Sequence, residues 1–165
     1  MVYSEDYKKL VDATALKDKY YEIDERVEEI CKEAFKGCDK LEEIVMPKKL
    51  KKIDSEAFQG CSSLTKLTLP DSVARIDGLA FCGCSGLTEL TLPNSVKSIG
   101  DGAFADCSDL SKITSLAEIP PVCGSGVFDR VNKTNCELIV PEGSVAAYTR
   151  AEDWNKFSNI RGFSK

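Results

Sequence analysis

Hydrophobic positions recur along this chain with a fixed period of 23 residues. The clearest unit covers residues 64–84, and the same pattern returns at 87–107 and stands one period earlier at 41–61. A fixed period in the range of about 20–50 residues is typical of stacked-repeat proteins, in which each unit buries its apolar side only against its neighbours. The pattern therefore predicts a solenoid of similar coils.

The first part of each unit alternates apolar and polar residues. Leu67 and Leu69 alternate with Lys66 and Thr68, which is the period of a half-buried strand. Pro70 follows and ends the strand, because proline cannot donate a ladder hydrogen bond. Equivalent strands of successive coils should then pair in parallel, about 4.8 Å apart.

The second part of each unit predicts a return path. Val73 and Ile76 point a short extended or turn segment inward, and Ala80, Phe81 and Cys84 favour a tight helical turn. We therefore expect an α/β solenoid, a right-handed coil of stacked short parallel strands and short helical turns, capped at both ends. The repeated aromatic and thiol positions predict a structural ladder through the core: Phe35, Phe58, Phe81, Phe104, Cys38, Cys61, Cys84 and Cys107.

The repeats divide the chain into three parts. Residues 1–17 precede them as an N-terminal cap or tail, residues 18–133 form about five coils, and residues 134–165 form a C-terminal cap with the last strand and a short helix. At the N-terminus, Ser4 is expected to cap a helix over residues 5–15.

At the C-terminus, residues 137–141 are expected to be the last strand. Ser144 is expected to cap a helix with a buried side, and Trp154 should plug the end of the stack. That buried side would consist of Val145, Tyr148, Ala151, Trp154 and Phe157.

The outward strand positions are the candidate partner face. Their charges alternate in sign from coil to coil, which favours cross-strand pairs. The same alternation also fits a solvated, self-neutralising sheet face with no partner. The face consists of Tyr20, Glu22, Glu43, Val45, Lys66, Thr68, Glu89, Thr91, Lys112 and Thr114. A second candidate is the spot at Leu79 and Cys82, since other repeats mostly hold polar or small residues at these positions.

Composition and charge exclude several classes of function. The net charge of -5 argues against nucleic acid or an anionic membrane as the main partner, because both need a basic face. The basic run at residues 48–52 follows an acidic run at 25–29 by one period, which predicts ion pairs rather than a binding patch. No apolar run approaches the ~20 residues that span a bilayer, so we expect no membrane insertion.

Candidate chemistry is sparse. The chain has no histidine, the usual general base and the commonest metal ligand, and no nucleophile–base pair, phosphate loop or metal cluster stands out. We therefore expect no enzyme activity, no cofactor and no metal site. The four cysteines in register should be buried free thiols, because they would stack slightly beyond disulfide range. Cys31 and Cys82 should be more exposed, and Cys123 and Cys136 form the one pair suspected of bonding.

The repeat unit, with its closing Pro-Pro, Val-Pro-x-Gly-Ser, Ala-Tyr and Trp-x-x-Phe motifs, resembles the 23-residue leucine-rich repeat of the BspA (treponemal) type over about residues 18–160. The resemblance implies a bacterial cell-surface or secreted protein linked to adhesion, although it transfers no binding residues. The N-terminus lacks the features of a signal peptide, so either the protein is cytosolic or its export signal has been cut away.

The leading hypothesis is a monomeric, non-enzymatic module that binds a protein, possibly of the host matrix or of another bacterial surface. A glycan-binding module is an alternative, but it would need aromatic platforms, and outward aromatic residues are few: Tyr20 and, as further candidates, Tyr3 and Tyr7. A passive spacer within a larger surface protein is the other alternative.

Overall fold

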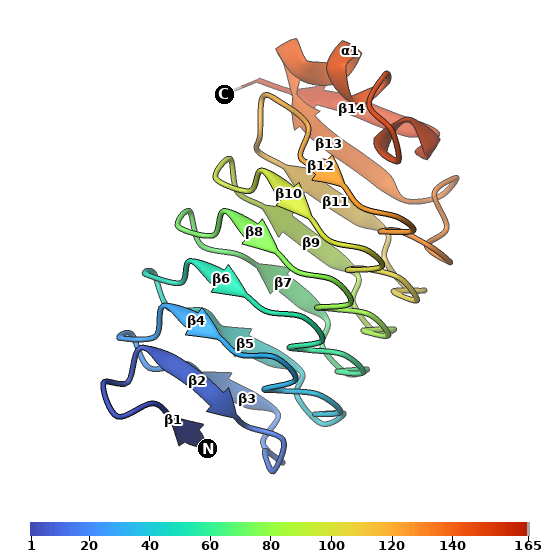
Figure 1. Cartoon of the computed structure of the whole chain (residues 1–165). Helices are drawn as coiled ribbons and strands as arrows, with labels where there is room; N and C mark the ends of the chain where they lie inside the picture. The colour runs from blue at the N-terminus through green and yellow to red at the C-terminus, as the bar shows by residue number, and fades with distance from the viewer. Residues whose placement is uncertain (165) are drawn as a thin grey trace.

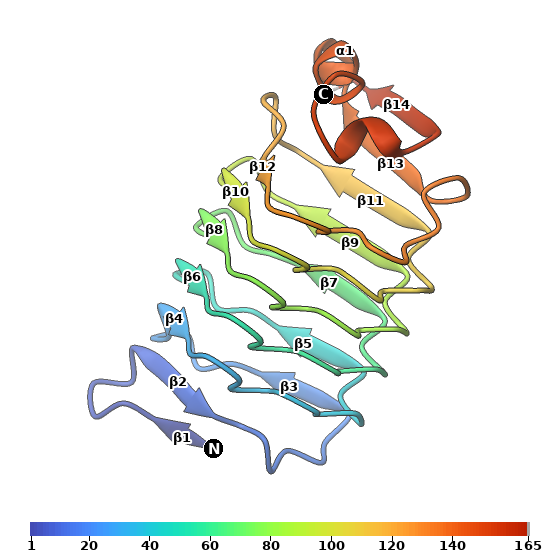
Figure 2. The ribbon, with the colours of Figure 1, turned by 45° about the vertical axis from the view of Figure 1, so that its right-hand side comes forward.

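The chain folds as a stack of flattened coils along one axis, with the N- and C-termini at opposite ends (Figure 1). The computed structural model describes residues 1–164. Each repeat contributes one strand to each of two opposite sides of the core (Figure 2). The stacked parallel strands that the 23-residue period predicts are therefore confirmed.

One side of the stack carries the longer strands, and we call it the long-strand face. A five-stranded parallel sheet has the order β14-β13-β11-β9-β7, and a separate pair, β3-β5, continues toward the N-terminus. The strands are β3 (Tyr20–Glu22), β5 (Glu43–Val45), β7 (Lys66–Thr68), β9 (Glu89–Leu92), β11 (Lys112–Ser115), β13 (Glu137–Pro141) and β14 (Asn159–Phe163).

The opposite side carries shorter strands in one continuous seven-stranded sheet, the short-strand sheet. Its order is β1-β2-β4-β6-β8-β10-β12, parallel except for the antiparallel pair β1-β2. The strands are β1 (Val2–Tyr3), β2 (Lys9–Asp12), β4 (Glu29–Ile30), β6 (Lys52–Ile53), β8 (Arg75–Ile76), β10 (Ser98–Ile99) and β12 (Val122–Cys123).

The core between the sheets follows the predicted ladder. The rings of Phe35, Phe58, Phe81, Phe104 and Phe128 stack in turn, with centroids 4.7, 5.0, 5.3 and 6.0 Å apart, and all are buried. The thiols of the four register cysteines are buried beside them, and each donates a hydrogen bond to a main-chain oxygen of the preceding coil at 3.2–3.4 Å.

The predicted helices do not form in the Ala-Phe segments, so the α/β part of the predicted fold class is not confirmed. The Ala-Phe segments form hydrogen-bonded turns, and residues 1–164 hold one four-residue α-helix and two 3-10 helices. The reason is backbone handedness: the residue before each Ala-Phe pair has a positive φ of 57–60° at Glu33, Glu56, Leu79 and Gly102. A right-handed helix cannot continue through a left-handed residue.

The predicted N-terminal helix is also wrong. Ser4 closes the β1-β2 hairpin instead of capping a helix: its Oγ accepts the Lys9 N–H at 3.0 Å and donates to Asp6 Oδ1 at 2.7 Å. Leu10 is buried while Val11 is exposed, which is the alternation of a strand.

The C-terminus differs from its prediction in two ways. The helix α1 (Val145–Tyr148) is short, and Ser144 makes no side-chain capping bond. Asp153, with φ of 66°, stands before the 3-10 helix η2 (Trp154–Lys156), so Trp154 and Phe157 do not continue α1. A further 3-10 helix, η1 (Glu142–Ser144), precedes α1. The last strand is β14 rather than β13.

The structure also decides three predictions about Trp154 and the cysteines outside the ladder. Trp154 is buried as expected, and its Nε1 donates to the Pro121 oxygen at 2.9 Å. Cys31 and Cys82 are half-buried, as expected for the more exposed thiols. Cys123 and Cys136 are both free, so the suspected bond between them is wrong.

Candidate interaction face

All ten predicted face residues lie on the long-strand face, as alternate residues of β3, β5, β7, β9 and β11. Between them, Ile44, Leu67, Leu90 and Ile113 point into the core. Exposure changes along the face: the six positions on β3, β5 and β7 are exposed, and the four on β9 and β11 are half-buried. Strand pairing divides the face into an N-terminal half, β3 and β5, and a C-terminal half that begins at β7.

The C-terminal half is internally paired. Lys66 lies 3.6 Å from Glu89, and at the far end Arg161 pairs with Glu137. The register places Lys112 between Glu89 and Glu137. Thr68, Thr91 and Thr114 stand side by side in the neighbouring row. Of the charge pairs predicted in this half, Lys66–Glu89 forms, whereas Lys112 makes no ion pair within residues 1–164, so the self-neutralising ladder is present only in part.

The N-terminal half lacks this pairing. Among residues 1–164, no ion pair engages Glu22 or Glu43. Tyr20 and Val45 are 50% and 38% exposed and stand opposite Glu43 and Glu22 in the strand register. Two carboxylates without a counter-ion and two exposed apolar side chains thus share one small area.

A groove separates the two halves. No ladder joins β5 to β7, although their Cα atoms come within 8 Å. The groove has a volume of about 620 Å³. Its lining consists of Glu43, Ile44, Val45, Met46, Thr65, Lys66, Thr68, Leu69 and Pro70. Sequence reasoning missed this feature, because Ile44 and Val45 fit the strand pattern as well as any other repeat.

The second predicted spot, at Leu79 and Cys82, has a packing explanation. Leu79 is 38% exposed, but its Cδ2 would lie 2.8 Å from a Cβ added at Gly102 of the next coil. The leucine therefore covers a glycine. Cys82 is half-buried, and desolvation raises the pKa of its thiol, which keeps it protonated and unreactive near neutral pH.

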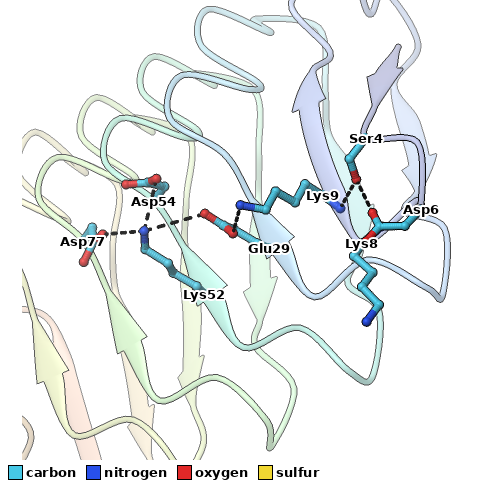
Figure 3. A network of polar contacts seen from close by, with 8 residues as sticks. All are labelled: Ser4, Asp6, Lys8, Lys9, Glu29, Lys52, Asp54 and Asp77. Atoms are coloured by element: carbon cyan, nitrogen blue, oxygen red, sulfur yellow. Dashed lines mark hydrogen bonds and ion pairs between the residues drawn. The ribbon is translucent and has the colours of Figure 1, made fainter.

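The short-strand sheet carries a charge network that the predicted face did not include. Lys52 lies 3.2–3.8 Å from Asp54, Glu29 and Asp77, and Lys9 lies 3.0 Å from Glu29 (Figure 3). Arg75 also pairs with Asp77. The sequence signal was available, because Glu29, Lys52 and Arg75 are spaced by exactly one period.

This network also accounts for part of the basic run. Lys51 pairs with Glu28 and Lys52 with Glu29, as predicted from the period. Lys48 and Glu25, the third predicted pair, are not joined within residues 1–164.

The N-terminal tyrosines do not form an open aromatic platform. Tyr7 is sandwiched: Tyr3 stacks on it with centroids 5.3 Å apart, and the Arg26 guanidinium carbon lies 3.9 Å from its ring centre. The Tyr3 hydroxyl in turn bonds that of Tyr21. Only Tyr20, of the aromatic residues proposed for glycan stacking, presents an uncovered ring to the long-strand face.

Residues 1–164 contain neither a candidate metal site nor a helix that could span a membrane. Within them, no group of three or more His, Cys, Asp or Glu side chains is placed to hold a metal ion. None of the helices in this range combines the length and apolar character needed to cross a membrane.

The stacked strands, the Phe ladder and the outward rows define the class: the chain is a leucine-rich repeat protein, a scaffold that presents side chains along a repeated surface. The family model described as "BspA type Leucine rich repeat region" matches residues 15–135 in six copies. The chain therefore belongs to the BspA-type leucine-rich repeat family, as its motifs indicated.

Solved structures agree on the fold. The pneumococcal vaccine antigen PcpA is 20% identical, with a TM-score of 0.77 over 98% of this chain and 45% of its own. A leucine-rich repeat protein of Bacteroides ovatus is 29% identical, with a TM-score of 0.64 over 87% and 37%. The leucine-rich repeat protein of T. pallidum is 23% identical, with a TM-score of 0.63 over 99% and 79%.

The chain thus spans less than half the length of the first two of these structures. A leucine-rich cell-surface protein of Faecalibacterium prausnitzii, 24% identical, has the same fold at a TM-score of 0.56 over 96% of this chain and 43% of its own. No curated protein matches the sequence.

Proposed function

We propose that this chain is a non-enzymatic protein-binding module of a bacterial cell-surface or secreted protein, and that it binds through the long-strand face. It acts as a monomer, and adhesion to a host matrix protein or to another bacterial surface protein is the role we assign to it. The family supports a repeat-based interaction scaffold, and the cell-surface neighbour suggests the location.

One observation carries the choice of face. Tyr20 and Val45 are exposed beside the carboxylates of Glu22 and Glu43, which lack a counter-ion within residues 1–164. Exposed aromatic and aliphatic side chains are the usual anchors of protein interfaces, and unpaired charges select a partner of opposite sign. The charge network of the short-strand sheet, by contrast, is already satisfied internally.

A binding screen tests the proposal. The purified chain is passed over immobilised fibronectin, fibrinogen and laminin beside a glycan array, and each hit is repeated at high salt. We expect saturable binding to one of these proteins, and we expect the Val45→Thr substitution to weaken that binding. Ile119→Thr is the matched control, because Ile119 is 78% exposed and does not belong to the face residues.

The outcomes separate the alternatives. Equal loss of binding in both variants would place the interface elsewhere and overturn the choice of face. A glycan hit without a protein hit would favour the carbohydrate reading, with Tyr20→Ala as its confirming variant. If the chain binds none of the immobilised proteins and no glycan, a passive spacer would be favoured.

A further inference from the structure

The groove between β5 and β7 is a break in an otherwise regular ladder. On its C-terminal side, Glu89 N–H donates to the Thr65 oxygen and Leu69 N–H to the Thr91 oxygen, at 3.5 and 3.4 Å. The equivalent bonds one coil earlier, from Lys66 to Glu42 and from Met46 to Thr68, do not form within residues 1–164; the bond from Thr65 N–H to the Glu42 oxygen, at 3.2 Å, is retained. Two strand edges therefore face the groove with main-chain donors and acceptors outside any ladder.

The width of the break limits what can enter it. A strand inserted between two others needs them about 9.6 Å apart, twice the usual spacing of about 4.8 Å. The Cα atoms of β5 and β7 come within 8 Å of each other. A complete extra strand does not fit without movement, whereas a single side chain does.

The chemistry of the lining selects that side chain. Ile44, Met46 and Leu69 are buried hydrophobic residues at its base, and the outward Val45 and Thr68 flank its mouth. Glu43 lines the groove and makes no ion pair within residues 1–164, while the only lysine of the lining, Lys66, is engaged by Glu89 at 3.6 Å. Apolar walls below a carboxylate and strand-edge carbonyls suit a long aliphatic stem that ends in several hydrogen-bond donors.

Arginine meets this description better than lysine. Its stem packs on apolar surface while its charged head stays near water, and its planar guanidinium offers five donors that can bond a carboxylate and carbonyls together. We propose that the groove is the subsite for an arginine side chain of the protein partner, with Glu43 as the residue that recognises its charge. This inference rests on the proposed function of the long-strand face.

The test uses the full chain and a defined probe. An acetylated, amidated pentapeptide with the sequence Val-Thr-Arg-Thr-Val is titrated into isotopically labelled protein and followed by NMR, beside the same peptide with citrulline, the neutral isostere, in place of arginine. We expect saturable shifts at the amides of Ile44, Met46, Lys66 and Thr68 with the arginine peptide, and at least tenfold weaker binding with citrulline.

Two matched variants test whether the carboxylate of Glu43 recognises the arginine of the peptide. Glu43→Gln should weaken the arginine peptide about tenfold, the loss typical of one charge-assisted hydrogen bond. Glu137→Gln, at the equivalent position four strands away on β13, should leave it unchanged. Equal affinity for both peptides, an unaffected Glu43→Gln variant or shifts confined to other strands would each overturn the inference.

Failure of the subsite and failure of the proposed function can be told apart. If a protein found in the screen binds the long-strand face and Glu43→Gln does not weaken it, the arginine subsite is wrong and the face stands. If the peptide binds the groove as expected and no protein binds the face, the subsite stands and the proposed partner class is wrong.

Discussion

The two halves of the long-strand face are built on the same coil and yet differ in what they leave unpaired. In the C-terminal half, β7, β9, β11, β13 and β14 form one sheet, in which Lys66 pairs with Glu89 and Glu137 with Arg161. In the N-terminal half, β3 and β5 form an isolated pair, and Glu22 and Glu43 have no counter-ion within residues 1–164. The short-strand sheet runs unbroken behind both halves.

The comparison teaches that the core and the face of a repeat protein are specified separately. The inward residues recur in every coil and hold the stack together, whichever half they lie in. The outward residues vary from coil to coil, and they decide where the surface is closed on itself and where it is open to a partner. The following predictions test this separation, from the largest expected effect to the smallest.

Phe58→Ala and Phe104→Ala should be equally damaging, because each removes a fully buried ring from the stack, one near each half of the face. Each should lower the free energy of unfolding by about 3–5 kcal/mol. Urea unfolding followed by circular dichroism measures both. A loss confined to one variant, or two separate transitions, would show that the halves do not share one core.

The buried thiols should make the stack sensitive to alkali in both halves alike. Burial raises the pKa of Cys61 and Cys107 to about 12, from an ordinary value of 9.0. The folded state therefore holds the proton more tightly than the unfolded state, and the stabilisation present below about pH 9 is lost as the pH rises toward 12.

The predicted slope is about 1.4 kcal/mol per pH unit for each thiol over this range. Cys61→Ala and Cys107→Ala should each flatten the decline by the same amount, measured as unfolding free energy between pH 8 and pH 10.5. A variant that only lowers stability, with the slope unchanged, would argue against a raised pKa at that thiol.

Amide exchange should mark the break between β5 and β7 directly. Ile23 and Leu69 N–H donate to the oxygens of Val45 and Thr91 at 3.1 and 3.4 Å, whereas Met46, the equivalent residue between them, makes no such bond. We expect the Met46 amide to exchange at least about tenfold faster than the other two in a hydrogen-exchange NMR experiment. Equal protection of the three amides would mean that the sheet is continuous.

Reversing a charge should have the smallest effect on the free energy of unfolding, and the size of this effect should differ between the two halves of the face. Lys66→Glu places like charges opposite each other at Glu89 and should cost about 0.2–1 kcal/mol. Glu43→Lys removes no ion pair and should cost close to nothing. Chemical denaturation at low salt compares the two, and a larger cost for Glu43→Lys would reveal a partner for that carboxylate within the protein.

The period of the sequence was sufficient to predict the repeat and its cross-strand register. Lys66 and Glu89 are 23 residues apart, and the structure places them opposite each other. The same arithmetic predicted that Lys51 and Lys52 pair with Glu28 and Glu29. Both predictions hold because a stacked coil converts a sequence period into a spatial contact.

What the period could not reveal is local backbone conformation. A positive φ is found at Glu33, Glu56 and Leu79, although none of them is a glycine. The residue types therefore gave no sign that the backbone would depart from a helical turn at these positions. Ser4 fits a helix cap and a hairpin turn equally well until its partners are known. The break after β5 is of the same kind, since Val45 suits a paired strand and an open edge alike.

The antiparallel β1 has a consequence for how this kind of surface changes in evolution. Because β1 runs antiparallel to β2, a coil stacked directly on β1 would meet a strand of opposite direction to the rest of the short-strand sheet. At the other end, the long-strand face extends through β13 and β14 after the short-strand sheet has stopped at β12, so the two sides end out of step. A whole 23-residue unit gained or lost between the two halves, by contrast, would keep the parallel register of both sheets. Each such event would move the open N-terminal half and the closed C-terminal half apart or together, and would leave both intact.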